Sequence, residues 1–158
     1  MNVIVIIVMQ LFAPLLDPYT IVGFEFAGSP EQAQLMVSTW RENGVLDSVY
    51  FVTGFDYLFM ITYSSFLWLA CLQVSGELSS RLNKMFIVLA WLQPVAAILD
   101  AVENVALFQI ISGSWKPLWP ILAASCAAPK FIIVLLAIIS CLGGVFYKLF
   151  RSSYSSIG

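Results

Sequence analysis

Two carboxylates and an amide stand together inside one of the most apolar stretches of the chain. Asp100, Glu103 and Asn104 lie in the run ILDAVENVAL, at positions i, i+3 and i+4. On a helix this spacing places all three on one face. In apolar surroundings such groups must pair with a base, bind a cation or take up protons, because an isolated buried carboxylate is very costly. A basic partner in similar surroundings is Lys130.

The composition indicates that the solvent around these groups is lipid. Of the 158 residues, 61% are hydrophobic and only 10% are charged, whereas a soluble domain carries roughly 25% charged residues. The net charge of -2 rests on few groups and includes no basic patch. Nucleic acid is therefore excluded as a partner, and the bilayer is the expected one.

Metal and redox chemistry find no support in the sequence. The chain has no histidine, which removes the commonest metal ligand and general base. Cys71, Cys126 and Cys141 form no CxxC pair and fall in apolar runs, so we expect small buried side chains in helices. No metal site is predicted, and no cofactor can be named.

Four segments are long and apolar enough to cross a bilayer, at about 2–24, 51–74, 85–111 and 119–147. Each must be helical, because lipid cannot satisfy backbone amides, and a kink is expected where Pro14 and Pro18 interrupt the first. The predicted fold is all-α: a four-helix transmembrane bundle. Residues 1–150 form a single domain, and the polar tail 151–158 is expected to be disordered.

Basic residues favour an orientation with both termini in the cytoplasm. The side that holds the termini and the loop near residue 80 carries four of them: Arg81, Lys84, Lys148 and Arg151. The opposite side carries Arg41 and Lys116.

The first non-cytoplasmic loop predicts a short amphipathic helix. In the sequence SPEQ, Ser29 is a candidate N-cap, Pro30 the first helical residue and Gln32 the partner of a capping box. We expect the helix to lie in the membrane interface, with Trp40 as an anchor, or to pack across the bundle mouth. An ordinary capped loop helix is the alternative.

Depths along the predicted spans bring charged residues to one level. Asp100 and Lys130 each lie roughly 16 Å from the outer ends of their helices, so Lys130 is expected to pair with Asp100 or Glu103. Pro129 is expected to open the helix there. The predicted ligand or ion cluster, in the outer half of the bilayer, contains Glu25, Asp56, Tyr63, Asp100, Glu103, Asn104 and Lys130. At least one carboxylate is then left to be protonated, hydrated from outside or matched to a bound cation.

Three classes of function are compatible with such a cluster. The first is an accessory or assembly subunit of a larger membrane complex, or a self-associating protein. The second is a protein that binds or transports a small ligand, a cation or protons. The third is a lipid- or isoprenoid-modifying enzyme, ranked last because no nucleophile–base pair, metal triad or phosphate loop is present, and no catalytic residue is assigned. The cluster could equally be structural and fix the helix register.

The order of several short motifs resembles an uncharacterised family of small bacterial four-helix integral membrane proteins. These motifs are FEFAGS (24–29), FDYLFMITY (55–63), LDAVENVAL (99–107) and PKF (129–131). The resemblance implies a multi-pass protein of the bacterial inner membrane and brings no known activity.

Overall fold

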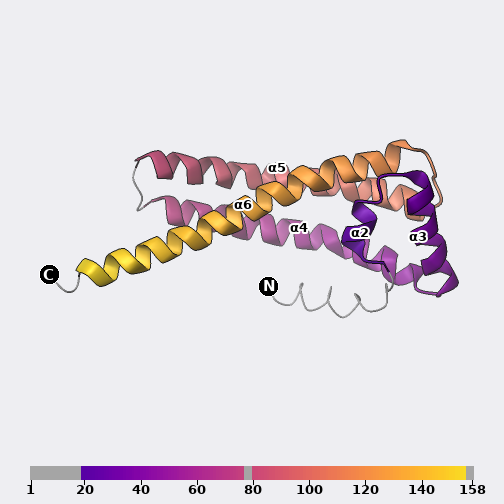
Figure 1. Cartoon of the computed structure of the whole chain (residues 1–158), viewed down its shortest axis with the longest axis horizontal. Coiled ribbons are helices and arrows are strands. Elements are labelled where there is room, and N and C mark those ends of the chain that lie inside the picture. Colours follow the sequence, from indigo (N-terminus) through magenta and orange to yellow (C-terminus); the bar gives the residue numbers. More distant parts are fainter. Residues whose placement is uncertain (1–18, 77–79, 156–158) are drawn as a thin grey trace.

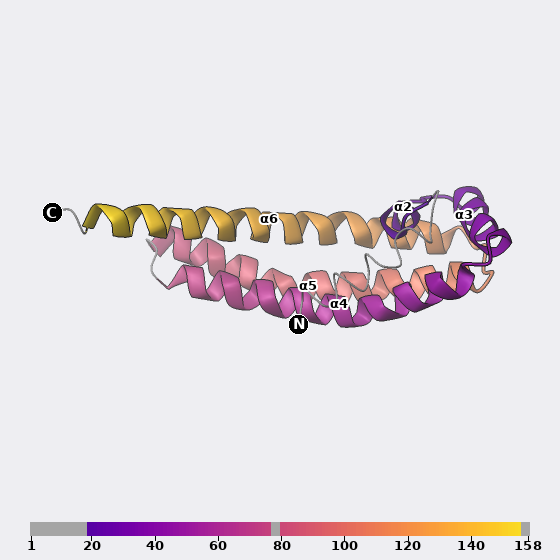
Figure 2. The same ribbon diagram turned by 90° about the horizontal axis from the view of Figure 1, so that it is seen from below.

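The chain is all-helical throughout the residues described by the computed structural model, which are 19–76 and 80–155, with side chains up to Tyr147. Two short helices, α2 (Ile21–Glu25) and α3 (Pro30–Glu42), precede three long ones, α4 (Leu46–Ser75), α5 (Ser80–Ile111) and α6 (Leu118–Ser155). The long helices lie lengthwise beside one another, and α2 and α3 gather at one end (Figures 1 and 2).

Three helices of the described residues are long and apolar enough to cross a membrane: Leu46–Ser75, Ser80–Ile111 and Leu118–Tyr147. They agree with three of the four predicted spans and with an integral membrane protein. The remaining predicted span, the first in the sequence at about 2–24, lies mostly outside the described residues. The four-helix count therefore stays a prediction.

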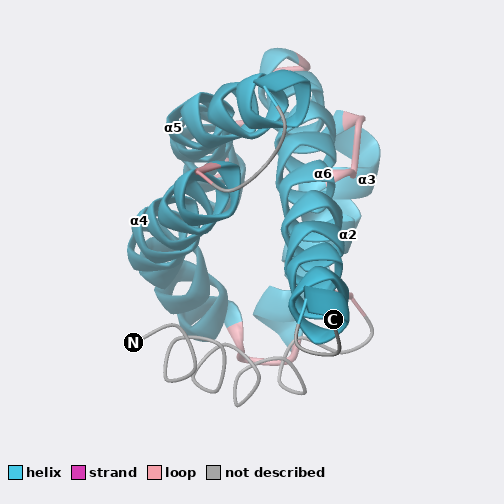
Figure 3. Ribbon diagram, turned by 90° about the vertical axis from the view of Figure 1, so that its left-hand side faces the viewer, coloured by secondary structure: helices cyan, strands magenta, loops and turns pink. Residues whose placement is uncertain are grey.

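The long helices are arranged with α5 at the apex and α4 and α6 as two arms (Figure 3). Helix α5 packs along both arms, whereas α6 meets α4 mainly near the C-terminal end of α4. There the Sγ atoms of Cys71 and Cys141 are 3.4 Å apart. A Cβ atom added to Gly144 would collide with Val74 and would lie 3.2 Å from the Phe86 ring. Glycine thus permits close approach of the two arms.

The helix ends extend further than the apolar segments. Helix α4 begins at Leu46 and α5 at Ser80, each about five residues earlier than predicted, because polar residues continue a helix beyond its apolar part. Helix α6 continues through Ser155, contrary to the disorder predicted for the start of the tail. Once a helix has formed, each added residue gains a backbone hydrogen bond, so no apolar partner is needed for the last turns.

Neither internal proline ends its helix. Pro94 lies within α5 and Pro129 within α6. The predicted opening at Lys130 is wrong, because an apolar environment leaves the neighbouring backbone groups no partner other than the helix itself.

A separate short helix replaces the predicted end of the first span. Thr20 has an extended backbone, with φ -118° and ψ 158°, and its hydroxyl accepts a hydrogen bond from the Gly23 amide at 3.0 Å. This is an N-cap, and it starts α2 at Ile21. The prediction of one span running through residue 24 is therefore wrong over residues 19–20, which are not helical, because the capping threonine begins a separate helix.

Helix α3 begins where the SPEQ motif predicts. Pro30 is its first residue, and the Ser29 hydroxyl accepts a hydrogen bond from the Gln32 amide at 3.3 Å. The helix lies across the end of the three long helices (Figure 1). The prediction that Trp40 anchors the protein in the membrane interface is wrong. Trp40 is fully buried, because its ring packs edge-on against Phe24, with the centroids 5.1 Å apart.

Two apolar clusters occupy the two ends of the described bundle. The first cluster joins α2 and α3 to the ends of the long helices and includes Phe24, Val37, Trp40, Leu107 and Ala123. The second cluster joins α4, α5 and α6 and consists of Leu67, Cys71, Val74, Phe86, Leu89, Ala90 and Ala137. Along each long helix, the predicted charged residues lie between these two clusters in the sequence.

Candidate functional site

A layer of buried polar side chains crosses the bundle between the two apolar clusters. Each of the seven residues predicted from the sequence lies in it or at its edge. Helix α2 contributes Glu25, α4 contributes Asp56 and Tyr63, α5 contributes Asp100, Glu103 and Asn104, and α6 contributes Lys130. The six charged or amide side chains are all at most 8% exposed. We call this layer the charged cluster.

Lys130 lies at the centre of the charged cluster. Its Nζ atom is 2.9 Å from Asp100 Oδ1 and 2.8 Å from Glu103 Oε2. A third carboxylate, Glu25, has its Oε2 atom at 3.6 Å. The predicted ion pair is therefore confirmed, and it involves both carboxylates that the sequence offered as alternatives. The Lys130 amine, paired with carboxylates in this way, is positively charged and has no free lone pair for nucleophilic chemistry.

Two hydrogen bonds extend the charged cluster toward α4. The Tyr63 hydroxyl donates to Asp100 Oδ2 at 2.9 Å, and the Asn104 side-chain amide donates to Asp56 Oδ2 at 2.7 Å. The i, i+3, i+4 spacing on α5 explains this division. Glu103 turns toward Lys130 on α6 and Asn104 toward α4, and Asp100 contacts both Lys130 and Tyr63.

The charged cluster contains more acid than base. Its four carboxyl groups face a single lysine, and Asp56 has no basic group within ion-pair distance among the described residues. The Oε2 atom of Glu25 has no hydrogen-bond partner although it is buried. Burial raises the pKa of Glu25, and the charge of Lys130 opposes this shift. The cluster can therefore accept a further cation or protons.

A cavity of about 600 Å³ opens beside the charged cluster. Its polar lining is Glu25, Asp56, Tyr63, Asp100 and Lys130. Its apolar lining is Ile21, Val22, Phe59, Phe66, Leu67, Phe131, Val134 and Ile138. These residues come from α2, α4 and α6, with Asp100 from α5. The cavity thus lies where the two arms of the bundle diverge, and we call it the acidic pocket.

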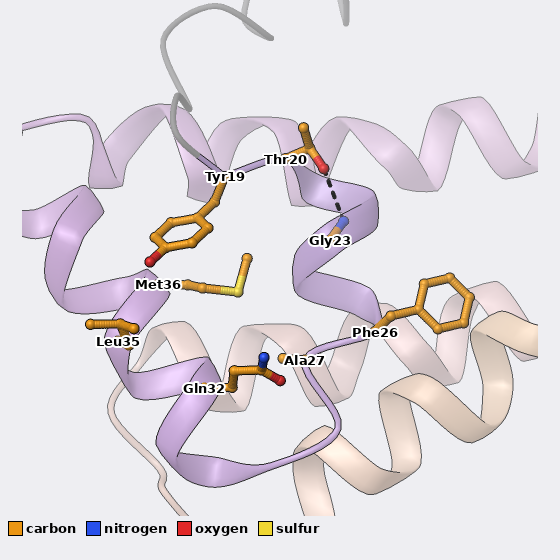
Figure 4. A pocket seen from close by; sticks show the side chains of 8 residues that line it. All are labelled: Tyr19, Thr20, Gly23, Phe26, Ala27, Gln32, Leu35 and Met36. Carbon is orange, nitrogen blue, oxygen red and sulfur yellow. Dashed lines mark hydrogen bonds between the residues drawn. The ribbon is translucent and has the colours of Figure 1, made fainter.

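A second cavity, of about 340 Å³, lies between α2 and α3 (Figure 4). Its lining includes Tyr19, Thr20, Gln32 and Met36, and the Thr20 hydroxyl there is occupied by the Gly23 amide. None of the described residues that line it is charged. It offers shape but little chemistry, so the acidic pocket is the stronger candidate.

Sequence reasoning found the polar residues of the site and missed the pocket walls. The pocket-wall residues Phe66, Phe131, Val134 and Ile138 belong to long apolar runs. Their neighbours are also apolar, so the sequence does not distinguish them. The one sequence signal for a pocket wall is that Asp56, Phe59 and Tyr63 share one face of a helix, which places Phe59 beside the polar residues. Among the described residues, no group of three or more histidine, cysteine or acidic side chains could hold a metal ion.

Comparison with known proteins adds no assignment. No protein-family model, no curated protein and no solved structure matches the chain. The site must therefore be interpreted from its own geometry.

Proposed function

We propose that the protein binds a small ligand in the acidic pocket. The observation that carries this proposal is a cavity of about 600 Å³ whose apolar walls end on a charged cluster with more carboxylates than cations. Ligand sites commonly occupy about 300–1,000 Å³ and combine apolar walls with a few placed polar groups. A purely structural ion pair would account for Lys130, Asp100 and Glu103, but it requires neither Asp56 nor a cavity.

The charge balance supports a ligand that brings positive charge or hydrogen-bond donors. Lys130 lies within 3.0 Å of Asp100 and Glu103, so these two carboxylates already have a cationic partner. Asp56 receives only the neutral amide of Asn104. Ionisable groups inside a membrane are expensive to maintain, and they usually mark a pathway or a binding site.

The test compares the small molecules that accompany two variants of equal charge. Asp56→Asn removes one carboxylate from the pocket, and Asp47→Asn removes one from the exposed first turn of the same helix. After gentle extraction from native membranes, mass spectrometry of the wild type and of Asp47→Asn is expected to find a shared compound near one per protein. Asp56→Asn is expected to lose it. The same bound compounds in all three proteins would contradict the proposal.

An accessory or assembly subunit is the second candidate, and one surface feature favours it. Trp91 is 62% exposed and lies roughly 16 Å along α5 from its first residue. Its ring centroid is 5.9 Å from that of Trp68 on α4. Lipid-facing tryptophans concentrate at the membrane interfaces, so an exposed tryptophan set well inside its helix favours contact with another protein.

Stoichiometric co-purification tests this second candidate. A partner subunit that is retained by the wild type and by Leu135→Ala, but lost from Trp91→Ala, would support it. Leu135 is a suitable control because it is similarly exposed, at 57%, on a different helix. Purification of the wild type without a stoichiometric partner would contradict it.

A further inference from the structure

We infer that the ligand of the acidic pocket is an amphiphile with a protonated amine headgroup, bound with its amine between Asp56 and Glu25. This inference rests on the proposed function and adds the chemical class of the ligand. It follows from two independent properties of the pocket: which carboxylates lack a close cationic partner, and what lines the remaining wall.

The headgroup is indicated by the two acidic residues that Lys130 does not neutralise closely. Glu25 is 6% exposed and lines the pocket, and its Oε2 atom is 3.6 Å from Lys130 Nζ, a longer ion pair than those of Asp100 and Glu103. Asp56 is 8% exposed, lines the same pocket and has a neutral partner only. An ammonium group offers three donors and one positive charge. Placed between these carboxylates, it would supply the close cationic partner that both lack.

The tail is indicated by the apolar wall. Phe59 and Phe66 of α4 and Val134 and Ile138 of α6 line the pocket. A hydrocarbon tail can make close van der Waals contacts with this wall, and a small hydrated ion cannot. A bare alkali or alkaline-earth cation would use the carboxylates and leave the wall unoccupied.

The same chemistry excludes ligands with an anionic head. Lys130 also lines the pocket, but it is already paired with Asp100 and Glu103. A fatty acid or a phosphate group would therefore place a negative charge beside carboxylates in a medium of low dielectric constant, where repulsion is strong. Phosphatidylethanolamine contains an amine, but its phosphate lies next to that amine. A lipid-derived or free amine without phosphate fits the pocket, and the experiment separates these sources.

The experiment measures binding of dodecylamine to the full-length protein in phosphatidylcholine nanodiscs, by native mass spectrometry. Dodecylamine is expected to saturate at one molecule per protein, with an affinity at least tenfold higher than that of dodecanol, which has the same tail and no charge. Dodecyltrimethylammonium, which has the charge but no N–H donor, is expected to fall between them. Replacement of part of the phosphatidylcholine by phosphatidylethanolamine is expected to leave dodecylamine binding unchanged. Competition from that lipid would assign the site to a phospholipid amine and overturn the exclusion of phosphate.

Matched variants locate the binding site. Asp56→Asn and Glu25→Gln are each expected to weaken dodecylamine binding tenfold or more. Asp47→Asn and Glu31→Gln remove equal charge from exposed positions and are expected to change it less than twofold. Two pocket variants keep the test decisive if one of them fails to fold. Equal binding of dodecylamine and dodecanol, or equal loss in pocket and control variants, would overturn the inference.

Failure of this inference is distinguishable from failure of the proposed function. If native membranes yield a bound compound that lacks an amine and depends on Asp56, the pocket binds a ligand of another class. The proposed function then stands and the inference is wrong. If no compound depends on Asp56 and dodecylamine does not bind, both are wrong.

Discussion

The two ends of the helical arms use opposite means to hold α4 and α6 in place. Near the C-terminal end of α4, Gly144 and the Cys71–Cys141 pair let the arms touch through small side chains. Toward α2 and α3 the arms diverge, and Lys130 connects α6 to carboxylates on α5 and α2. Only the diverging part leaves a cavity of about 600 Å³.

This difference teaches how a small membrane protein can combine rigidity with a binding site. Lipid is as apolar as a leucine side chain, so helices in a bilayer gain little from burial of apolar groups and associate through close packing or polar contacts. Close packing fills space and leaves no room for a ligand. Polar contacts act over separated backbones and can hold helices apart around a pocket.

The largest effect is expected from removal of the central cation. Lys130→Met leaves buried carboxylates without their partner, and breaking a buried pair in this way costs about 3–5 kcal/mol. We expect the yield of folded protein to collapse, as measured by size-exclusion chromatography after extraction. Lys116→Met, at an exposed position, is the control. Normal yield and thermal stability of Lys130→Met would show that the charged cluster does not hold α2, α5 and α6 together.

A smaller effect is expected at the contact between α6 and the C-terminal end of α4. Gly144→Ala places a Cβ atom against Val74, whose branched side chain is stiff, and overpacking of this kind costs about 1–3 kcal/mol. Unfolding in mixed micelles measures the change in stability. The neighbouring Gly143 has nothing within 4 Å of an added Cβ, so Gly143→Ala is expected to be neutral or stabilising. Equal stability of the two variants would mean that the arms do not touch at Gly144.

One hydrogen bond of the charged cluster can be removed alone. Tyr63→Phe deletes the donor to Asp100 Oδ2 and keeps the ring, which is expected to cost about 1 kcal/mol. In Tyr57→Phe the lost bond is longer, 3.4 Å to the Ala101 carbonyl, and the cost should be smaller. The same unfolding assay ranks the two variants, and the reverse order would argue against the Tyr63–Asp100 contact.

The last prediction concerns position and not stability. The Cys71 and Cys141 sulfurs must approach from 3.4 Å to about 2.0 Å to form a disulfide. Treatment of membranes with diamide, which accepts the two hydrogens, is expected to join them within one chain. Peptide mapping by mass spectrometry detects the link. It should persist in Cys126→Ser and vanish in Cys71→Ser. A link that involves Cys126 instead would place the arms in another register.

The pairing within the charged cluster could be predicted because helical geometry is regular. The i, i+3, i+4 spacing sets a common face, and the rise per residue sets the level of Asp100 against Lys130. Neither depends on side-chain packing. The additional contact of Lys130 with Glu25 depends on α2, whose separate start at Thr20 was not anticipated.

The pocket and the burial of Trp40 could not be predicted, because both depend on how the elements pack. A tryptophan in a loop helix has the same sequence pattern whether it meets lipid or, as here, Phe24 and Tyr19. The pocket lies where α4 and α6 diverge beyond their contact at Gly144, and there Lys130 reaches carboxylates on α5 and α2. No local pattern encodes that divergence.

The contact at Gly144 is a point about which α6 can tilt. The Gly144–Val74 contact lies roughly 21 Å along the helix from Lys130. A tilt of about 5° around that contact would move Lys130 by roughly 2 Å, which exceeds the tolerance of a hydrogen bond. The apolar side chains at the Gly144 contact would accommodate such a rotation with little loss of packing. The Lys130 ammonium group would lose its ion pairs, so the charged cluster is sensitive to the angle between the two arms.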